Sequence, residues 1–258
     1  MMKPQLIDSH CHLYLDAFTA DIQDVIARAQ AEGVNRFFLP AIDSQEHENM
    51  LNLEKAFPQC LPMMGLHPCS VKENYLDELA IVRDYLAKRK FWAVGEIGLD
   101  YYWDKTYIKE QEYALNQQIE LALAFDLPVV IHSRAAIDDC IRVVSAHQDG
   151  RLRGIFHCFG DTEAHAKKII DLGFLLGIGG VLTYKNSGLA ATLASISLEH
   201  MVLETDAPYL TPVPFRGKRN ESSYLKYIAE KLAEVKQTTA EEVANITSSN
   251  ALKLFRAG

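Results

Sequence analysis

The 258-residue sequence predicts a single α/β domain, residues 1–258, folded as a closed TIM (β/α)8 barrel, and three observations support this. Short apolar, β-branched runs alternate with helical stretches along the whole chain. Eight such runs occur, the number that closes a barrel of about this length. No linker, repeat or low-complexity segment divides the chain. The alternative is an open doubly wound sheet, which usually has a glycine-rich turn after its first strand, and HCHLYLD lacks one.

The expected strands are short runs of apolar and β-branched residues that end in polar or turn residues. In chain order they cover residues 6–10, 34–42, 61–67, 91–98, 128–133, 153–159, 174–180 and 201–208. Residues 208–220, rich in proline and charge, form the longest irregular stretch. Because this stretch follows the last strand, we expect it to be an active-site loop.

Helices are expected between the strands. One begins near Ile108 and places Leu115, Ile119 and Ala122 on one stripe with a 3.6-residue period. A second stripe consists of Tyr224, Ile228, Leu232 and Val235. Thr239 and Glu242 have the spacing of a capping box, which predicts the start of the last helix.

Composition limits the class of protein. Hydrophobic residues make up 48% of the chain, enough for a sizeable core. No apolar run reaches about 18 residues, so no membrane span is expected. The start MMKPQLIDSH lacks the apolar segment of a signal peptide. Five cysteines without a CxxC pair argue against a disulfide framework. We therefore expect a cytoplasmic protein.

The formal net charge of −8 argues against broad, non-specific binding of duplex nucleic acid, which normally needs a basic face. It does not exclude a substrate that contains phosphate. Bound divalent cations and a few basic side chains can reverse the potential within one cleft.

Residues that can bind metal or transfer protons end six of the eight expected strands. They are His10, His12, His67, Glu96, His132, His157 and Asp206. Singly, each is as readily a buried, hydrogen-bonded side chain. In a barrel, however, the carboxyl ends of all strands meet at one face, so together these residues predict a metal centre.

The number of candidate ligands predicts two divalent ions, because one catalytic zinc takes about three protein ligands plus water. Glu96 is the expected bridge, since a carboxylate has two oxygens. We assign His10, His12, Glu96 and Asp206 to one ion, and Glu96, His132 and His157 to the other. Mixed nitrogen and oxygen ligation favours Zn, Mn, Co or Ni over Ca and fits Mg only weakly.

Two neighbouring ions lower the pKa of a shared water and polarise a phosphate or carbonyl oxygen, so the predicted reaction is hydrolysis. Asp206 and Glu96 are the expected catalytic residues, with Asp206 accepting the proton of the attacking water. His67 and Arg134 are expected to bind substrate, because a guanidinium at this rim fits phosphate or carboxylate.

Asp8 and Glu204 each precede a candidate ligand by two residues and face inward by strand alternation. They are expected to orient histidine ligands through hydrogen bonds to the ring nitrogens that do not face the metal. The alternative, nearly as well supported, is that both belong to a buried polar network without a catalytic role. Alternation turns Cys11 and Cys158 away from the interior as packing residues. The remaining histidines are expected on the surface, namely His47, His147, His165 and His200.

An aromatic run follows the fourth expected strand, at Tyr101, Tyr102 and Trp103. Aromatic side chains at a cleft can stack on bases, and at the base of a loop they are as often packing residues. Further basic residues supply local positive charge or form a solvated face: Lys185, Arg216, Lys218 and Arg219.

Six ordered segments, IDSHCHL, GLHP, GEIGLDYY, VIHSR, FHCFG and ETDAPYL, resemble the TatD-type metal-dependent hydrolases, most closely the YjjV-like branch. The resemblance covers essentially the whole chain. It implies a barrel of the metal-dependent hydrolase superfamily with two divalent ions, in some members a third. The ligands it implies are His10, His12, Glu96, His132, His157 and Asp206. Glu96 stands where many related amidohydrolases have a carbamylated lysine.

The resemblance also implies phosphodiester hydrolysis on DNA, in some members as a 3′-to-5′ exonuclease on single strands. The leading prediction is therefore a metal-dependent deoxyribonuclease acting on single-stranded DNA ends or on a small phosphodiester. An amidohydrolase or esterase for a small molecule, using the same metals, is the alternative. A non-catalytic binding protein is disfavoured, because such a protein has little reason to keep six metal-capable residues.

Overall fold

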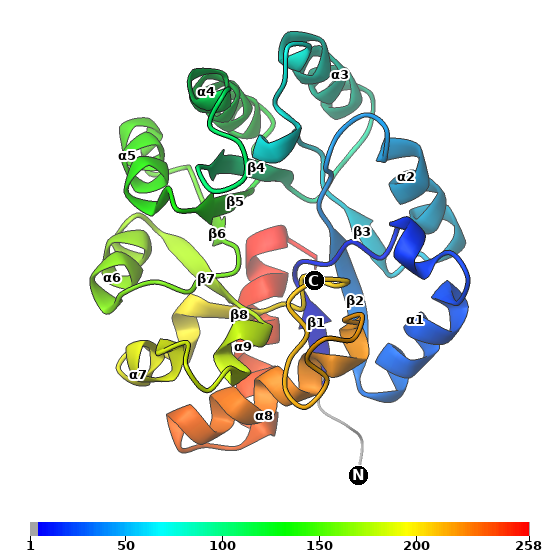
Figure 1. The fold of residues 1–258 in the computed structure, drawn as a ribbon, viewed down its shortest axis with the longest axis vertical. Coiled ribbons are helices and arrows are strands. Elements are labelled where there is room, and N and C mark those ends of the chain that lie inside the picture. The colour runs from blue at the N-terminus through cyan, green and yellow to red at the C-terminus, as the bar shows by residue number, and fades with distance from the viewer. Residues whose placement is uncertain (1–4, 258) are drawn as a thin grey trace.

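The computed structural model describes residues 5–257 and contains a ring of parallel strands surrounded by helices (Figure 1). The strands are β1 (Leu6–Asp8), β2 (Val34–Leu39), β3 (Cys60–Pro62), β4 (Val94–Asp100), β5 (Val129–Arg134), β6 (Gly154–Phe156), β7 (Phe174–Ile178) and β8 (Met201–Leu203). Each overlaps one of the expected runs. Most strands end earlier than expected, because the chain leaves the sheet before it reaches the site residues.

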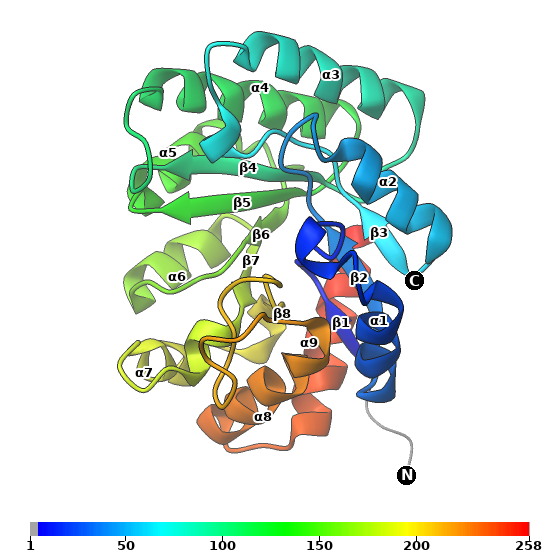
Figure 2. The ribbon, with the colours of Figure 1, turned by 45° about the vertical axis from the view of Figure 1, so that its right-hand side comes forward.

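Helices cover the outside of the ring in chain order, except the last one, which lies across one end of the ring, as Figures 1 and 2 show. They are α1 (Ile22–Ala31), α2 (His47–Ala56), α3 (Tyr75–Lys88), α4 (Ile108–Ala124), α5 (Ile137–His147), α6 (Glu163–Asp171), α7 (Leu189–Ala194), α8 (Leu225–Lys236) and α9 (Ala240–Phe255). The predicted start at Ile108 is confirmed. The Thr239 hydroxyl accepts a hydrogen bond from the backbone N–H of Glu242, as the capping spacing predicted. Within residues 5–257, no helix has the length and hydropathy to cross a membrane.

Strand order follows chain order in two hydrogen-bonded groups, β1–β2–β3 and β4 to β8. Backbone hydrogen bonds just beyond the strand ends join the groups. Gly95 N donates to Met64 O at 3.0 Å on one side, and Ser9 N donates to Leu203 O at 3.0 Å on the other. The ring is therefore a barrel, and the sequential order excludes the doubly wound alternative, in which strand order reverses.

The interior of the barrel is apolar at the end where the strands begin. Ile7, Phe38, Leu61, Met63, Val130, Ile155 and Val202 form a buried cluster with residues of α9. The Phe255 ring of α9 stacks on Phe38 with centroids 3.9 Å apart, so this helix fills the amino-terminal end of the barrel. Removing apolar surface from water stabilises this packing of α9 against the strands by about 25 cal/mol for each Å² that is buried. Polar side chains are thereby confined to the opposite, carboxyl-terminal mouth.

Candidate metal centre

The six predicted ligands come from five strands and meet at the carboxyl-terminal mouth. Their positions relative to the strands differ. Glu96 and His132 lie within β4 and β5, whereas His157 follows β6 directly and Asp206 stands three residues after β8. His10 and His12 lie on the bent segment after β1. Glu96 is at the centre of the group.

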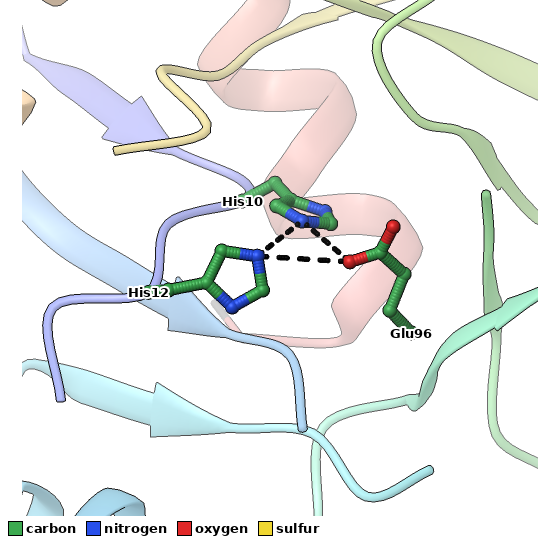
Figure 3. A group of neighbouring side chains, drawn as sticks. All are labelled: His10, His12 and Glu96. Atoms are coloured by element: carbon green, nitrogen blue, oxygen red, sulfur yellow. Dashed lines mark hydrogen bonds and ion pairs between the residues drawn. The ribbon is translucent and has the colours of Figure 1, made fainter. Parts of the chain in front are cut away.

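The first set of donors surrounds one oxygen of Glu96 (Figure 3). Nε2 of His10 lies 3.3 Å from Nε2 of His12, and the two nitrogens lie 3.1 and 3.6 Å from Glu96 Oε2. Asp206 Oδ1 lies 3.6 Å from the first nitrogen and 3.5 Å from the second. Two imidazole nitrogens that face each other and two carboxylate oxygens at this distance are donors suited to one divalent cation.

The second set surrounds the other oxygen of the same carboxylate. Glu96 Oε1 lies 2.8 Å from His132 Nδ1, 3.4 Å from His67 Nε2 and 3.6 Å from His157 Nε2. The two oxygens of Glu96 thus face two different groups of imidazoles. This is the arrangement that a bridging carboxylate requires.

Charge in this cluster favours an added cation. Burial opposes ionisation of Glu96, but the imidazoles of His67, His10 and His157 lower its pKa well below the usual range. Burial also lowers the pKa of His157, and the carboxylates of Glu204 and Glu96 outweigh it and raise that pKa to about 10. The ionised Glu96 carboxylate and the imidazole nitrogens around it are donors whose chemistry and spacing fit a divalent metal ion.

Glu204 lies behind His157, the position from which it was expected to orient the ring. Its Oε1 lies 2.9 Å from His157 Nδ1 and accepts a hydrogen bond from the backbone N–H of Cys158 at 2.5 Å. The carboxylate fits only because Gly177 on β7 has no side chain, since an added Cβ would lie 2.3 Å from Glu204 Oε2. Fixing Nδ1 in this way leaves Nε2 directed toward Glu96.

Asp8 takes part in a buried polar network, which was the alternative expectation for this residue. The strand β1 ends at Asp8, so alternation does not extend to the imidazoles. Its carboxylate accepts hydrogen bonds from Thr205 N, Thr205 Oγ1 and Ser222 Oγ at 2.6 to 2.9 Å. It reaches His10 only at the backbone N–H, at 3.4 Å. Asp8 therefore joins β1 to the chain after β8, and any effect on the imidazoles passes through the backbone.

We expect Asp8→Ala to lower the free energy of unfolding by about 3 kcal/mol, because it leaves buried donors without an acceptor. Urea unfolding followed by circular dichroism measures this change. Asp149→Ala, which removes an exposed carboxylate, is the control and should change stability by less than about 0.5 kcal/mol. A loss for Asp8→Ala no larger than that of the control would contradict the role in joining the strands.

Asp100 is a functional candidate that the sequence reasoning missed. Its Oδ2 lies 2.9 Å from His132 Nε2, and its Oδ1 accepts hydrogen bonds from the backbone N–H groups of Tyr102 and Trp103. Burial raises the pKa of Asp100, but these hydrogen bonds outweigh it and keep the carboxyl ionised. Asp100 stands four residues after Glu96 on β4, so strand alternation was a signal that could have found it.

Cys158 and His47 are not where the sequence analysis placed them. Cys158 lines the cavity above the metal centre, because β6 ends at Phe156 and the backbone turns at Cys158 with φ of +48°. His47 is buried, with its ring 5.3 Å from that of Tyr85, rather than on the surface. Cys11 is buried as a packing residue, as predicted. The other three histidines are partly exposed, namely His147, His165 and His200.

The cavity over this candidate metal centre has a volume of about 780 Å³. His67 and Arg134, the predicted substrate-binding residues, both line it. Trp103 and Tyr209 add exposed aromatic surface. Such a pocket, with a few convergent polar groups and perturbed pKa values, is typical of an active site.

The other aromatic and basic residues singled out in the sequence differ in their surroundings. Tyr101 packs against the core, and its N–H donates to Arg134 O, whereas Tyr102 and Trp103 are exposed. Arg219 forms an ion pair with Asp21 at 2.7 Å, so its charge is directed away from the cavity toward a carboxylate. Arg216 and Lys218 lie over the rings of Tyr184 and Phe215, respectively.

Comparison with known proteins gives a consistent picture. Residues 7–256 match the family model described as TatD related DNase. The uncharacterized metal-dependent hydrolase YabD of Bacillus subtilis is 37% identical over 252 residues, which cover 97% of this chain and 99% of that protein. The 3′-5′ ssDNA/RNA exonuclease TatD of Citrobacter rodentium is 30% identical over 256 residues, 97% of each chain. The crystal structure of YjjV, a TatD homologue from Escherichia coli, superimposes with a TM-score of 0.93 at 30% identity, covering 99% of both chains.

Proposed function

Since this chain belongs to the TatD-related DNase family of metal-dependent hydrolases, we propose that it hydrolyses phosphodiester bonds as a deoxyribonuclease. We assign it a 3′-to-5′ action on single-stranded ends. One observation carries the proposal: the two oxygens of Glu96 face two groups of imidazoles at 2.8 to 3.6 Å. Paired ions are the recurrent means of stabilising the attacking and leaving oxygens of phosphate esters.

Glu96 with His10, His12 and Asp206 would hold one ion, and Glu96 with His132 and His157 the other. When bound, such ions supply Lewis-acid activation of water and of the phosphate oxygen. Zn, Mn, Co and Ni match these nitrogen and oxygen donors, and Mg matches them less well.

Asp206 is the group proposed to accept the proton of the attacking water. It lines the cavity, and its side chain retains some exposure. Burial raises the pKa of Asp206, but the hydrogen bond with His12 and the charges of His157 and His10 lower it below the usual value. The carboxylate is therefore ionised at neutral pH and able to act as a general base.

Arg134 supports a phosphate-containing substrate. Its side chain lines the cavity, and among residues 5–257 it forms no ion pair with a carboxylate. In a chain of net charge −8, an unpaired guanidinium beside a metal centre is available for an anion. Arginine matches the oxygens of a phosphate with two parallel N–H donors.

We expect Arg134→Ala to lower kcat/KM on single-stranded DNA by about 10- to 100-fold, mainly through KM, because it removes charge-assisted hydrogen bonds. Steady-state kinetics with a labelled oligonucleotide measures this. The matched control is Arg153→Ala. The Arg153 guanidinium forms an ion pair with Asp126, and Arg153 directly precedes β6, at the end of the barrel opposite the cavity. An unchanged kcat/KM for Arg134→Ala would refute the binding role.

The direct test of function is reconstitution. Protein stripped of metal is loaded with one ion type at a time and assayed on single-stranded DNA and on a neutral ester side by side. The proposal expects metal-dependent release of nucleotides from the 3′ end. Activity on the ester alone would overturn it in favour of an esterase or amidohydrolase.

A further inference from the structure

Two of the most exposed aromatic side chains are neighbours in the sequence, Tyr102 and Trp103. Trp103 is 67% exposed and Tyr102 is 58% exposed, in the turn that follows β4. Trp103 lines the cavity that contains the metal centre. The metal-ligand set does not include either ring, and large apolar surface in water is unfavourable unless something covers it.

Arg134 completes this surface. Its guanidinium carbon lies 4.2 Å from the centroid of the Tyr102 ring and 5.2 Å from that of the Trp103 ring. The two rings meet edge to face, with centroids 5.0 Å apart. Tyr102, Trp103 and Arg134 are called the aromatic platform below. It combines π faces with a positive charge, which is the chemistry that binds single-stranded nucleic acid.

Asp100 fixes the platform relative to the metal centre. One carboxylate oxygen accepts the backbone N–H groups of Tyr102 at 2.9 Å and Trp103 at 3.0 Å. The other oxygen lies 2.9 Å from Nε2 of His132, whose Nδ1 faces Glu96. A single side chain therefore holds both the aromatic turn and a proposed metal ligand.

A third aromatic side chain, Tyr209, lies on the other side of the cavity. Tyr209 is 52% exposed and lines the same cavity, on the loop after β8, four strands around the ring from β4. Its N–H donates to Asp206 O at 2.8 Å, and its C=O accepts from Asn220 Nδ2 at 2.6 Å. Its position beside Asp206 is thus fixed by the backbone. The cavity has stacking surfaces on two sides of the metal centre.

We propose that the aromatic platform stacks on an unpaired base next to the phosphodiester that is cleaved, and so selects single-stranded ends. This inference rests on the proposed phosphodiesterase function. In a duplex, pairing and stacking hold each base in the helix and leave at most one face of the terminal pair free, so a base that leaves the helix to stack on the platform must be unpaired. Because every base has a π face, little sequence preference is expected.

The test compares two oligonucleotides of equal length, one natural and one whose 3′-terminal nucleotides lack bases. The wild-type protein is expected to have a lower KM for the natural strand. Trp103→Ala should reduce this preference by about 10-fold, and Trp103→Phe should retain most of it. The control is Tyr113→Ala, an aromatic residue 46% exposed on α4 that does not line the cavity. Equal losses on both strands, or an unchanged preference, would overturn the proposal.

A binding measurement separates this inference from the proposed function. Fluorescence anisotropy of a labelled single strand is recorded with Glu96→Ala and with Glu96→Ala combined with Trp103→Ala. An affinity about 10-fold weaker in the double variant supports the platform even if the wild-type protein cleaves neither strand. An equal affinity overturns the platform even if the wild-type protein is an active nuclease.

Discussion

Glu96→Ala is expected to reduce hydrolysis by about 1,000-fold or more and to lower the metal content of the purified protein. The reason is geometric. Both oxygens of this one carboxylate are within 3.6 Å of imidazole nitrogens, so its removal opens both proposed metal sites at once. Removing it also takes away one of the negative charges that face the imidazoles of His10 and His157. Turnover on single-stranded DNA and elemental analysis of bound metal measure the two effects.

A second buried glutamate provides the control for Glu96. Glu78 accepts hydrogen bonds from Ser44 N and Ser44 Oγ, outside the cluster of proposed ligands. Glu78→Ala should therefore cost stability, while bound metal stays at the wild-type level. If Glu96→Ala kept both its turnover and its metal, the proposed centre would have to be abandoned.

Asp206→Asn is expected to lower kcat by about 100- to 10,000-fold with a smaller change in KM, because an amide cannot accept the proton from water. Asparagine is the appropriate substitution here. Asp206 has φ of +56°, a left-handed conformation that asparagine tolerates better than most residues. The amide also retains one oxygen toward His10 and His12. A loss in kcat therefore has two sources: the lost proton acceptor, and the loss of one negative charge from the donors of one proposed metal site.

Single-turnover cleavage with saturating metal checks this prediction, since it separates chemistry from substrate binding and product release. Asp149→Asn, at an exposed site, is the control. A kcat within about tenfold of wild type would rule out Asp206 as the principal proton acceptor.

The fold and the convergence of the six proposed ligands follow from local patterns in the sequence. Eight apolar runs separated by helical stretches specify a barrel, and a barrel brings strand carboxyl ends to one mouth. His132 and His157 are far apart in sequence from His10, yet this single rule places them around Glu96. The distances between the donors depend on the tertiary structure, including the close packing of Glu204 against Gly177.

The unexpected surroundings of Asp8 and Cys158 have one cause, which is the position at which each strand ends. Alternation was extended past Asp8 and past Phe156, where the chain has already left the sheet. Asp8 therefore joins two strands, and Cys158 enters the cavity instead of packing behind it. Strand ends are set by neighbouring chain segments rather than by local preference, so periodicity alone does not locate them. His47 shows the same effect at the start of a helix, where tertiary packing buries a polar side chain.

The central claim is that the Glu96 carboxylate holds two cations between the strands of this barrel. Anomalous diffraction from a crystal soaked in Mn²⁺ tests it most directly. Two peaks that share Glu96 are expected, one beside His10, His12 and Asp206 and the other beside His132 and His157. A single peak, or peaks that do not adjoin Glu96, would contradict it.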